Sequence, residues 1–118
     1  MTPTELITTY LAWTRAIPKL EHDAQLIELS TTKLSYGYAH VLRFLLPVAR
    51  SMAFAAQKDL KRLDIRILAE HEERGELFLL WKHRGETHML RMRRNKIQAL
   101  VQAKVDELVS TINKTTPI

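Results

Sequence analysis

The 118-residue sequence has room for one domain of ordinary size, and its 46% hydrophobic and 26% charged residues are typical of a globular chain, which argues against disorder. The absence of cysteine excludes disulfides, thiolate metal sites and a cysteine nucleophile. The net charge of +5 permits a polyanionic partner without requiring one. Because no leader sequence is recognisable and apolar runs are far shorter than a membrane span, we expect a cytoplasmic protein.

The N-terminal residues carry a helix-start signal. Thr2 is a suitable N-cap, the following proline suits the first helical position, and Glu5 lies three residues after the cap. Apolar residues then recur at helical spacing, and Pro18 should end the helix. Residues 19–35 fit either a short helix with a polar exit or a loop with a brief extended run.

A second helical pattern covers residues 36–60, where apolar residues recur every three or four positions. Pro47 lies inside this pattern, so it either kinks one long helix or starts a second one.

Residues 63–94 alternate between apolar and polar positions and contain two isolated glycines, which predicts a three-stranded meander. At the first turn, a two-residue loop at 74–75 would put Ile65 and Trp81 on opposite faces. A three-residue loop with a bulge at Gly75 puts them together, so burial favours the bulge. The second turn is predicted as a two-residue Gly85-Glu86 loop of type II′. The apolar face so predicted comprises Ile65, Ile67, Ala69, Leu77, Leu79, Trp81, Leu90 and Met92.

The last helix should begin near Asn95, which forms a capping-box pattern with Gln98, and should carry an apolar stripe from Ile97 to Ile112. Residues 1–118 are therefore expected to form one α+β domain. Its parts are N-terminal helices, a three-stranded antiparallel meander and a C-terminal amphipathic helix packed on the sheet.

Sites for catalysis or cofactors are not indicated. Clustered glycines are needed to cradle phosphate, and the glycines here are isolated from one another. No zinc-protease, nucleophile-elbow or EF-hand spacing occurs. Glu70, Glu72 and Glu76 are predicted on the solvent face, where water keeps carboxylates ionised. We therefore expect a non-enzymatic protein without a cofactor.

Three histidines are predicted to share one face of the sheet, with His83 directly opposite His88 and His71 nearby. Imidazoles at that separation could bind a metal. The alternative is that they are boundary residues where the core meets solvent, and without motif spacing this second interpretation is favoured.

The other face of the sheet is the most informative surface. Its predicted apolar strip would be seldom left bare on a monomer, which favours a protein partner or a symmetric homodimer. Alternatively, basic residues around a Phe could grip phosphates while a base stacks on the ring. The strip comprises Leu68, Phe78, Leu80 and Met89, and the basic residues on or just beyond this face are Arg66, Lys82, Arg91, Arg93, Arg94 and Lys96.

The middle helix adds basic residues at spacings of seven and eight, Arg43, Arg50 and Lys58, which could track phosphates or be a solvated face. Acidic residues are interspersed among the basic ones, so protein–protein interaction ranks first and nucleic-acid binding second. The nucleic-acid hypothesis assigns its contacts to Arg43, Arg50, Lys82, Arg91, Arg93, Arg94 and Lys96.

Overall fold

The structure is a computed structural model. It describes the backbone of residues 2–28 and 33–115 and the side chains of residues 2–26, 41 and 43–110. It is an α+β fold of three helices and one three-stranded antiparallel sheet with strand order β1-β2-β3, as predicted. The elements in chain order are α1 (Pro3–Glu28), α2 (Lys33–Arg62), β1 (Ile65–Glu73), β2 (Glu76–His83), β3 (Glu86–Arg93) and α3 (Arg94–Thr115).

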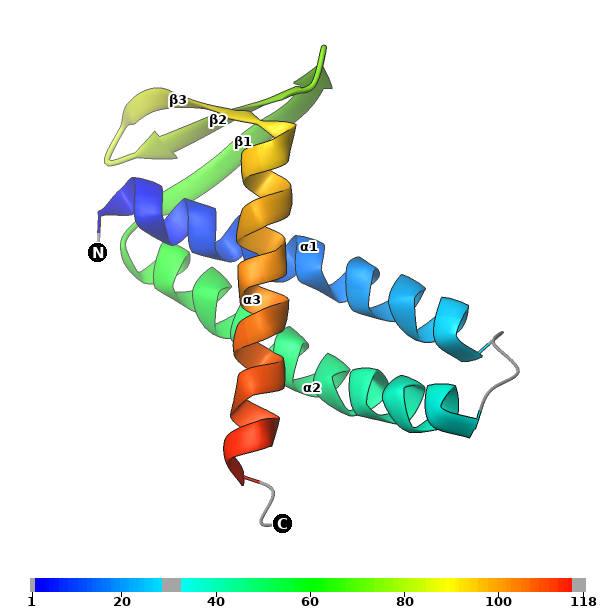
Figure 1. Ribbon diagram of the computed structural model, residues 1–118. Helices are drawn as coiled ribbons and strands as arrows, with labels where there is room; N and C mark the ends of the chain where they lie inside the picture. The colour runs from blue at the N-terminus through cyan, green and yellow to red at the C-terminus, as the bar shows by residue number, and fades with distance from the viewer. Residues whose placement is uncertain (1, 29–32, 116–118) are drawn as a thin grey trace.

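The three described helices lie on one side of the sheet (Figure 1). α1 and α2 run antiparallel and side by side, and α3 descends from the sheet across both of them. Apolar side chains from all three helices and from the facing side of the sheet form one core. The far end of the α1–α2 pair extends beyond both α3 and the sheet.

Helix α1 begins as predicted, because the hydroxyl of Thr2 accepts a hydrogen bond from the Glu5 backbone N–H at 3.2 Å. The prediction that Pro18 ends this helix is wrong, since α1 continues to Glu28. A proline inside a helix removes one backbone hydrogen bond and costs about 3 kcal/mol. Full burial of Leu20 and Ala24 after the proline offsets that cost. Of the ambiguous residues 19–35, residues 19–28 are therefore helix, residues 33–35 begin α2, and residues 29–32 lie outside the described residues.

Helix α2 runs without interruption through Pro47, so the second of the two predicted alternatives, a new helix starting there, is excluded. Its buried side chains include Leu45, Ala49, Ala56 and Leu60, which face the core at helical spacing. Pro47 itself is exposed.

The first hairpin corrects the predicted turn. Arg74 and Gly75 both have positive φ (51° and 75°) and form a two-residue loop of type I′, with Glu73 paired to Glu76. The extra residue is in the strand instead, at Leu68, between the pairs Ile67–Trp81 and Ala69–Leu80. A bulge inside β1 thus satisfies both the tight turn and the burial of the isoleucines.

The second hairpin also turns one residue earlier than predicted. The loop is Arg84-Gly85, again with positive φ at both residues (50° and 83°), and His83 pairs with Glu86. Type I′ turns match the right-handed twist of the strands that they join. Relative to the prediction the β2–β3 register moves by two residues, so the same side chains still share a face.

The core face of the sheet is as predicted with one exception. Ala69 follows the bulge and pairs with Leu80, so it lies on the opposite face. The remaining residues of the predicted face are buried or half-buried beneath the sheet: Ile65, Ile67, Leu77, Leu79, Trp81, Leu90 and Met92. Glu70 and Glu72, which pair with Leu79 and Leu77, share this face at its outer end.

Helix α3 follows β3 with no loop between them, so it begins one residue before the predicted cap Asn95. The backbone N–H of Arg94 donates a 2.8 Å hydrogen bond to the carbonyl of Gly75, which ties the helix start to the first hairpin turn. Ile97, Val101 and Val105 of this helix are buried. None of the helices in the described ranges has an apolar stretch long enough to cross a membrane.

Candidate interaction surface

The outer face is the side of the sheet that points away from the three helices. The register places Ala69, Leu80 and Met89 side by side across the three strands. The next row outward contains His71, Phe78 and Arg91. The structure thus brings three of the predicted partner-binding residues together, Phe78, Leu80 and Met89, with Leu68 at the adjacent bulge.

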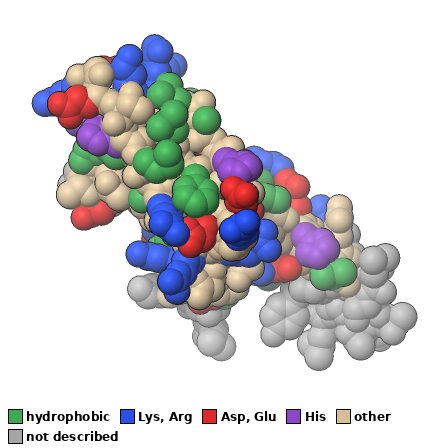
Figure 2. All heavy atoms as spheres, turned by 90° about the horizontal axis from the view of Figure 1, so that it is seen from above, with side chains coloured by type: hydrophobic (Ala, Val, Ile, Leu, Met, Phe, Trp, Pro, Cys, Tyr) green, Lys and Arg blue, Asp and Glu red, His purple; other side chains and the backbone are tan. Residues whose placement is uncertain are grey.

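These four residues form the apolar strip, and two of them are strongly exposed. Met89 has 60% of its surface exposed and Leu68 has 48%, while Phe78 and Leu80 are half-buried between the flanking strands. Figure 2, which looks down on the sheet, shows hydrophobic side chains in a run with charged side chains at both ends. Among the described residues, no helix or loop covers this strip.

One end of the apolar strip carries an ion pair over an aromatic ring. The guanidinium of Arg91 lies 5.6 Å from the centre of the Phe78 ring and forms a bidentate ion pair with Glu76. The hydrogen bonds from Arg91 lower the pKa of the Glu76 carboxyl, so this acid stays ionised beside the strip. Arg91 is therefore engaged within the chain, and its charge is locally neutralised.

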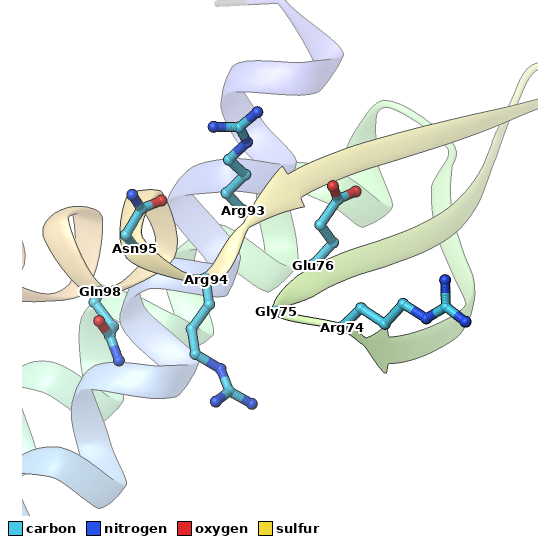
Figure 3. Close-up of a pocket in the computed structure, with 7 residues that line it drawn as sticks. All are labelled: Arg74, Gly75, Glu76, Arg93, Arg94, Asn95 and Gln98. Atoms are coloured by element: carbon cyan, nitrogen blue, oxygen red, sulfur yellow. The ribbon is translucent and has the colours of Figure 1, made fainter.

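The predicted basic cluster is divided between the two sides of the sheet. Arg93 lies on the outer face, on the same side as Glu76, whereas Arg94 points the opposite way (Figure 3). Arg94 lies 3.4 Å from Glu72 beneath the sheet. Of the residues assigned to nucleic acid on this sheet, Lys82, Arg91 and Arg93 are exposed on the outer face, and Lys96 is exposed on α3.

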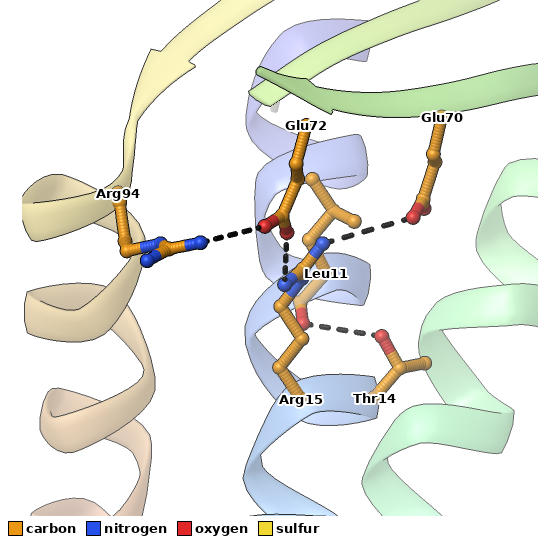
Figure 4. A network of polar contacts seen from close by, with 6 residues as sticks. All are labelled: Leu11, Thr14, Arg15, Glu70, Glu72 and Arg94. Atoms are coloured by element: carbon orange, nitrogen blue, oxygen red, sulfur yellow. Dashed lines mark hydrogen bonds and ion pairs between the residues drawn. The ribbon is translucent and has the colours of Figure 1, made fainter. Parts of the chain in front are cut away.

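Beneath the sheet, an ion-pair network joins three elements (Figure 4). Arg15 of α1 reaches Glu72 at 2.9 Å and Glu70 at 3.7 Å, and Arg94 of α3 completes it. The prediction that Glu70 and Glu72 lie on the solvent face is wrong, because the Leu68 bulge turns them toward the helices. Glu76 does lie on the outer face, as predicted. Each of these carboxylates faces an arginine, an arrangement that stabilises the charged form and does not resemble an acid–base pair.

The histidines are not gathered as predicted. His71 pairs with Phe78 on the outer face, while His83 and His88 lie on the core face. His88 pairs with Trp81, not with His83, and its ring stacks on the indole at 4.5 Å between centroids. No group of three or more metal-binding side chains occurs in the part of the chain that the structure describes.

The basic residues of α2 are exposed but partly neutralised. Arg50 is 3.1 Å from Glu21 of α1, and Lys58 lies over the Phe54 ring at 4.7 Å. Arg43 is exposed on the same helix. These side chains belong to α2, away from the outer face, so the structure does not join them to the basic residues of the sheet.

Comparison with known proteins identifies a family but no closer relative. Residues 2–113 match the family described as YhjD protein, so the chain belongs to that family. Neither the curated proteins nor the solved structures contain a match.

Proposed function

We propose that this member of the YhjD family is a non-enzymatic, cytoplasmic protein-interaction domain that presents its outer face to a protein partner. The family description names no activity, so the proposal depends on the surface. The observation that carries it is the exposure of Met89 and Leu68 on either side of Leu80, on a face that no described element covers.

Physical chemistry favours a partner for such a strip. Burying an exposed apolar side chain stabilises an assembly by about 1.5–3 kcal/mol when burial is complete. Methionine adapts to irregular partner surfaces because its side chain is unbranched and its sulfur is polarizable. Met89 at the centre of the edge strand β3 is therefore expected to contribute most to binding.

The charged residues around the apolar strip also favour a protein partner over a polyanionic one. Glu73 and Glu76 lie at one end of the outer face, and Glu76 neutralises Arg91. A mixed rim around an apolar centre is the usual composition of a protein–protein interface. The negative charges of a phosphate backbone bound on this face would be repelled by these carboxylates.

The test is affinity capture with purified protein from extracts of the source cells, followed by direct binding to the recovered protein. Wild type should recover a partner in stoichiometric amount, and Met89→Glu should weaken binding more than tenfold. Phe54→Glu is the matched control, because it places the same acid on an exposed apolar residue of α2. Equal binding by wild type and Met89→Glu would contradict the proposal.

Nucleic-acid binding is the second candidate, and one observation supports it. Arg66 and Lys82 are cross-strand neighbours on the outer face, and neither forms an ion pair within the described residues. Nucleic-acid binding is measured by fluorescence anisotropy with single-stranded and duplex oligonucleotides, first at low salt and then at rising salt. Binding that weakens steeply with salt and is lost in the Arg66→Glu/Lys82→Glu double variant would favour this candidate over the first.

A further inference from the structure

A second apolar surface lies on α2, separate from the outer face. Val41, Phe44, Val48 and Met52 are spaced by three or four residues and therefore share one side of the helix. Phe44 is 70% exposed, and the other three are 37–40% exposed. Ser51 and Ala55, both exposed, continue the same side, and these six residues are the α2 stripe. It begins in the half of α2 that extends beyond α3 and the sheet (Figure 1).

The α2 stripe is free of charge in a chain with a net charge of +5. None of its six positions holds an ionisable side chain, although the same helix carries six basic residues, Lys33, Arg43, Arg50, Lys58, Lys61 and Arg62. Past its C-terminal end comes Lys58, which lies over the Phe54 ring at 4.7 Å, followed by Asp59 and Arg62, which pair with each other at 3.3 Å. Such a surface offers nothing to a polyanion, and two copies of it can approach without repulsion.

The stripe also has an asymmetry along its length. Its first half contains Val41 and Phe44, and its second half contains Met52 together with the small Ser51 and Ala55. Antiparallel pairing of two copies about Val48 places Val41 of each copy on the small Ala55 of the other. It also sets Phe44 against the flexible thioether of Met52, a favourable sulfur–aromatic contact.

Antiparallel pairing further separates the basic C-terminal ends of the two helices. Lys61 lies 13 residues from Val48, so the two Lys61 side chains would be about 39 Å apart at 1.5 Å per residue. Screening at physiological salt acts over about 8 Å, so these charges would not repel. Parallel pairing would place them side by side.

The exposed apolar area of the α2 stripe is smaller than that of a standard interface and fits a weak dimer. With about 200 Å² for a whole Phe side chain, Phe44 exposes roughly 140 Å², and the stripe as a whole roughly 300 Å². A standard interface buries about 800 Å² on each partner, of which somewhat more than half is apolar. A dimer that dissociates in the micromolar range is therefore expected.

From these observations we infer that the α2 stripe is the contact surface of an antiparallel homodimer with its two-fold axis near Val48. This inference goes beyond the proposed function, because it concerns a different surface and a different partner. The outer faces of both copies stay open in such a dimer.

Sedimentation velocity from about 1 to 100 µM tests the inference. Wild type should shift from monomer to dimer, and Val48→Glu should stay monomeric over the whole range. Phe54→Glu, the matched control on the same helix off the stripe, should dimerise like wild type. Ala55→Arg adds bulk at an exposed position with good helix propensity, so it should raise the dissociation constant at least tenfold even if Val48→Glu fails to fold.

Crosslinking through introduced thiols then tests the direction of pairing, since the chain has no cysteine of its own. A bis-maleimide that spans about 10 Å should join two copies of Val48→Cys, because packed helices lie 8–10 Å apart. Two copies of Met52→Cys would be offset by about 12 Å along the helices and should not be joined. Equal crosslinking at both positions would contradict the antiparallel arrangement.

Three results would overturn the inference. The first is a wild-type protein that is monomeric at every concentration. The second is a dimer that persists in both Val48→Glu and Ala55→Arg. The third is a dimer that Met89→Glu abolishes and Val48→Glu does not, which would move self-association to the outer face. If the protein dimerises but recovers no protein partner, only the proposed function is contradicted.

Discussion

At the scale of single residues, Glu72 joins three elements beneath the sheet. It accepts hydrogen bonds from Arg15 of α1 and Arg94 of α3, and therefore links β1 to two helices. These hydrogen bonds, that from Arg15 first, lower the pKa of Glu72 below its ordinary value of 4.5. A carboxyl group whose pKa is lower in the folded state stabilises the fold above its ordinary pKa and loses that contribution as the pH falls through the folded value.

Glu72→Gln should therefore lower the free energy of unfolding at pH 7 by about 1 kcal/mol, since two exposed ion pairs are lost. The difference from wild type should shrink as the pH falls below 4.5 and vanish once the pH lies below the lowered pKa of the folded state, where Glu72 is protonated in both states. Urea denaturation at a series of pH values measures it. Glu73→Gln, whose described contact is His71 at 3.5 Å, is the control and should change little. A difference in the free energy of unfolding that stays constant with pH would contradict this account.

At the scale of elements, both hairpin turns contain an arginine in a conformation that it disfavours. Arg74 and Arg84 have φ near +50°, where a residue with a Cβ is strained by about 1 kcal/mol. Asparagine tolerates this region, and Asn-Gly is the preferred pair for a type I′ turn.

Arg74→Asn should raise the free energy of unfolding by about 0.5–1 kcal/mol, measured as an increase in Tm of several degrees. The matched control is Arg66→Asn, in which the same substitution is made at an extended position of β1. This change should be destabilising, because asparagine is a poor strand former. Stabilisation by both variants would show that loss of charge, and not turn geometry, is responsible.

The Leu68 bulge leads to a prediction about deletion. Without Leu68, Ile67 and Ala69 become neighbours opposite Trp81 and Leu80, so every other β1–β2 pair is retained. The deletion should cost less than about 1 kcal/mol, while partner binding through the outer face weakens. Deletion of Leu80 from β2 is the contrasting case, because it would put Leu79 and Trp81 on opposite faces and unfold the domain. Circular dichroism and thermal melts compare the two.

The bulge also explains how far the sequence could predict the fold and the site. Alternation and glycine position were sufficient for the meander, its core face and the row of Phe78, Leu80 and Met89. The position of the bulge residue could not be predicted from the sequence, because a bulge at Gly75 and one at Leu68 bury the same isoleucines. Glu70 and Glu72 were consequently assigned to the wrong face. Pro18 was misread because local propensity does not account for the burial that follows it.

The α2 stripe was not predicted, because periodicity alone does not show which apolar face of a helix is covered. Val41, Val48 and Met52 belong to the same helical pattern as the buried Leu45 and Ala49. Only the packing of α1 on one side of α2 distinguishes the covered apolar face from the exposed one. A helix with apolar residues over more than one third of its circumference was the available signal for a second contact.

At the scale of the whole molecule, the protein is elongated. Its radius of gyration is 16.4 Å, whereas a compact domain of this length has about 13.5 Å. The difference arises because the far end of the α1–α2 pair has no third layer packed on it (Figure 1). An open shape leaves more apolar surface in water, in agreement with the two contact surfaces proposed above.

Small-angle X-ray scattering of the monomeric Val48→Glu variant should therefore give a radius near 16 Å. Wild type at high concentration should give a larger value, because antiparallel pairing extends the assembly. A radius close to 13.5 Å for the variant would show that the helical pair folds back on the rest of the domain.

The direct junction of β3 and α3 gives the molecule a mechanical property. No loop separates strand from helix, and the Arg94–Gly75 hydrogen bond fixes the joint to the first hairpin. The 22 residues of α3 form a rod about 33 Å long. If a ligand on the outer face tilted the sheet by about 10°, the far end of α3 would move by roughly 6 Å against the helices on which Val101, Val105 and Leu108 pack. Such a tilt would therefore disturb the packing of α3 on the other two helices.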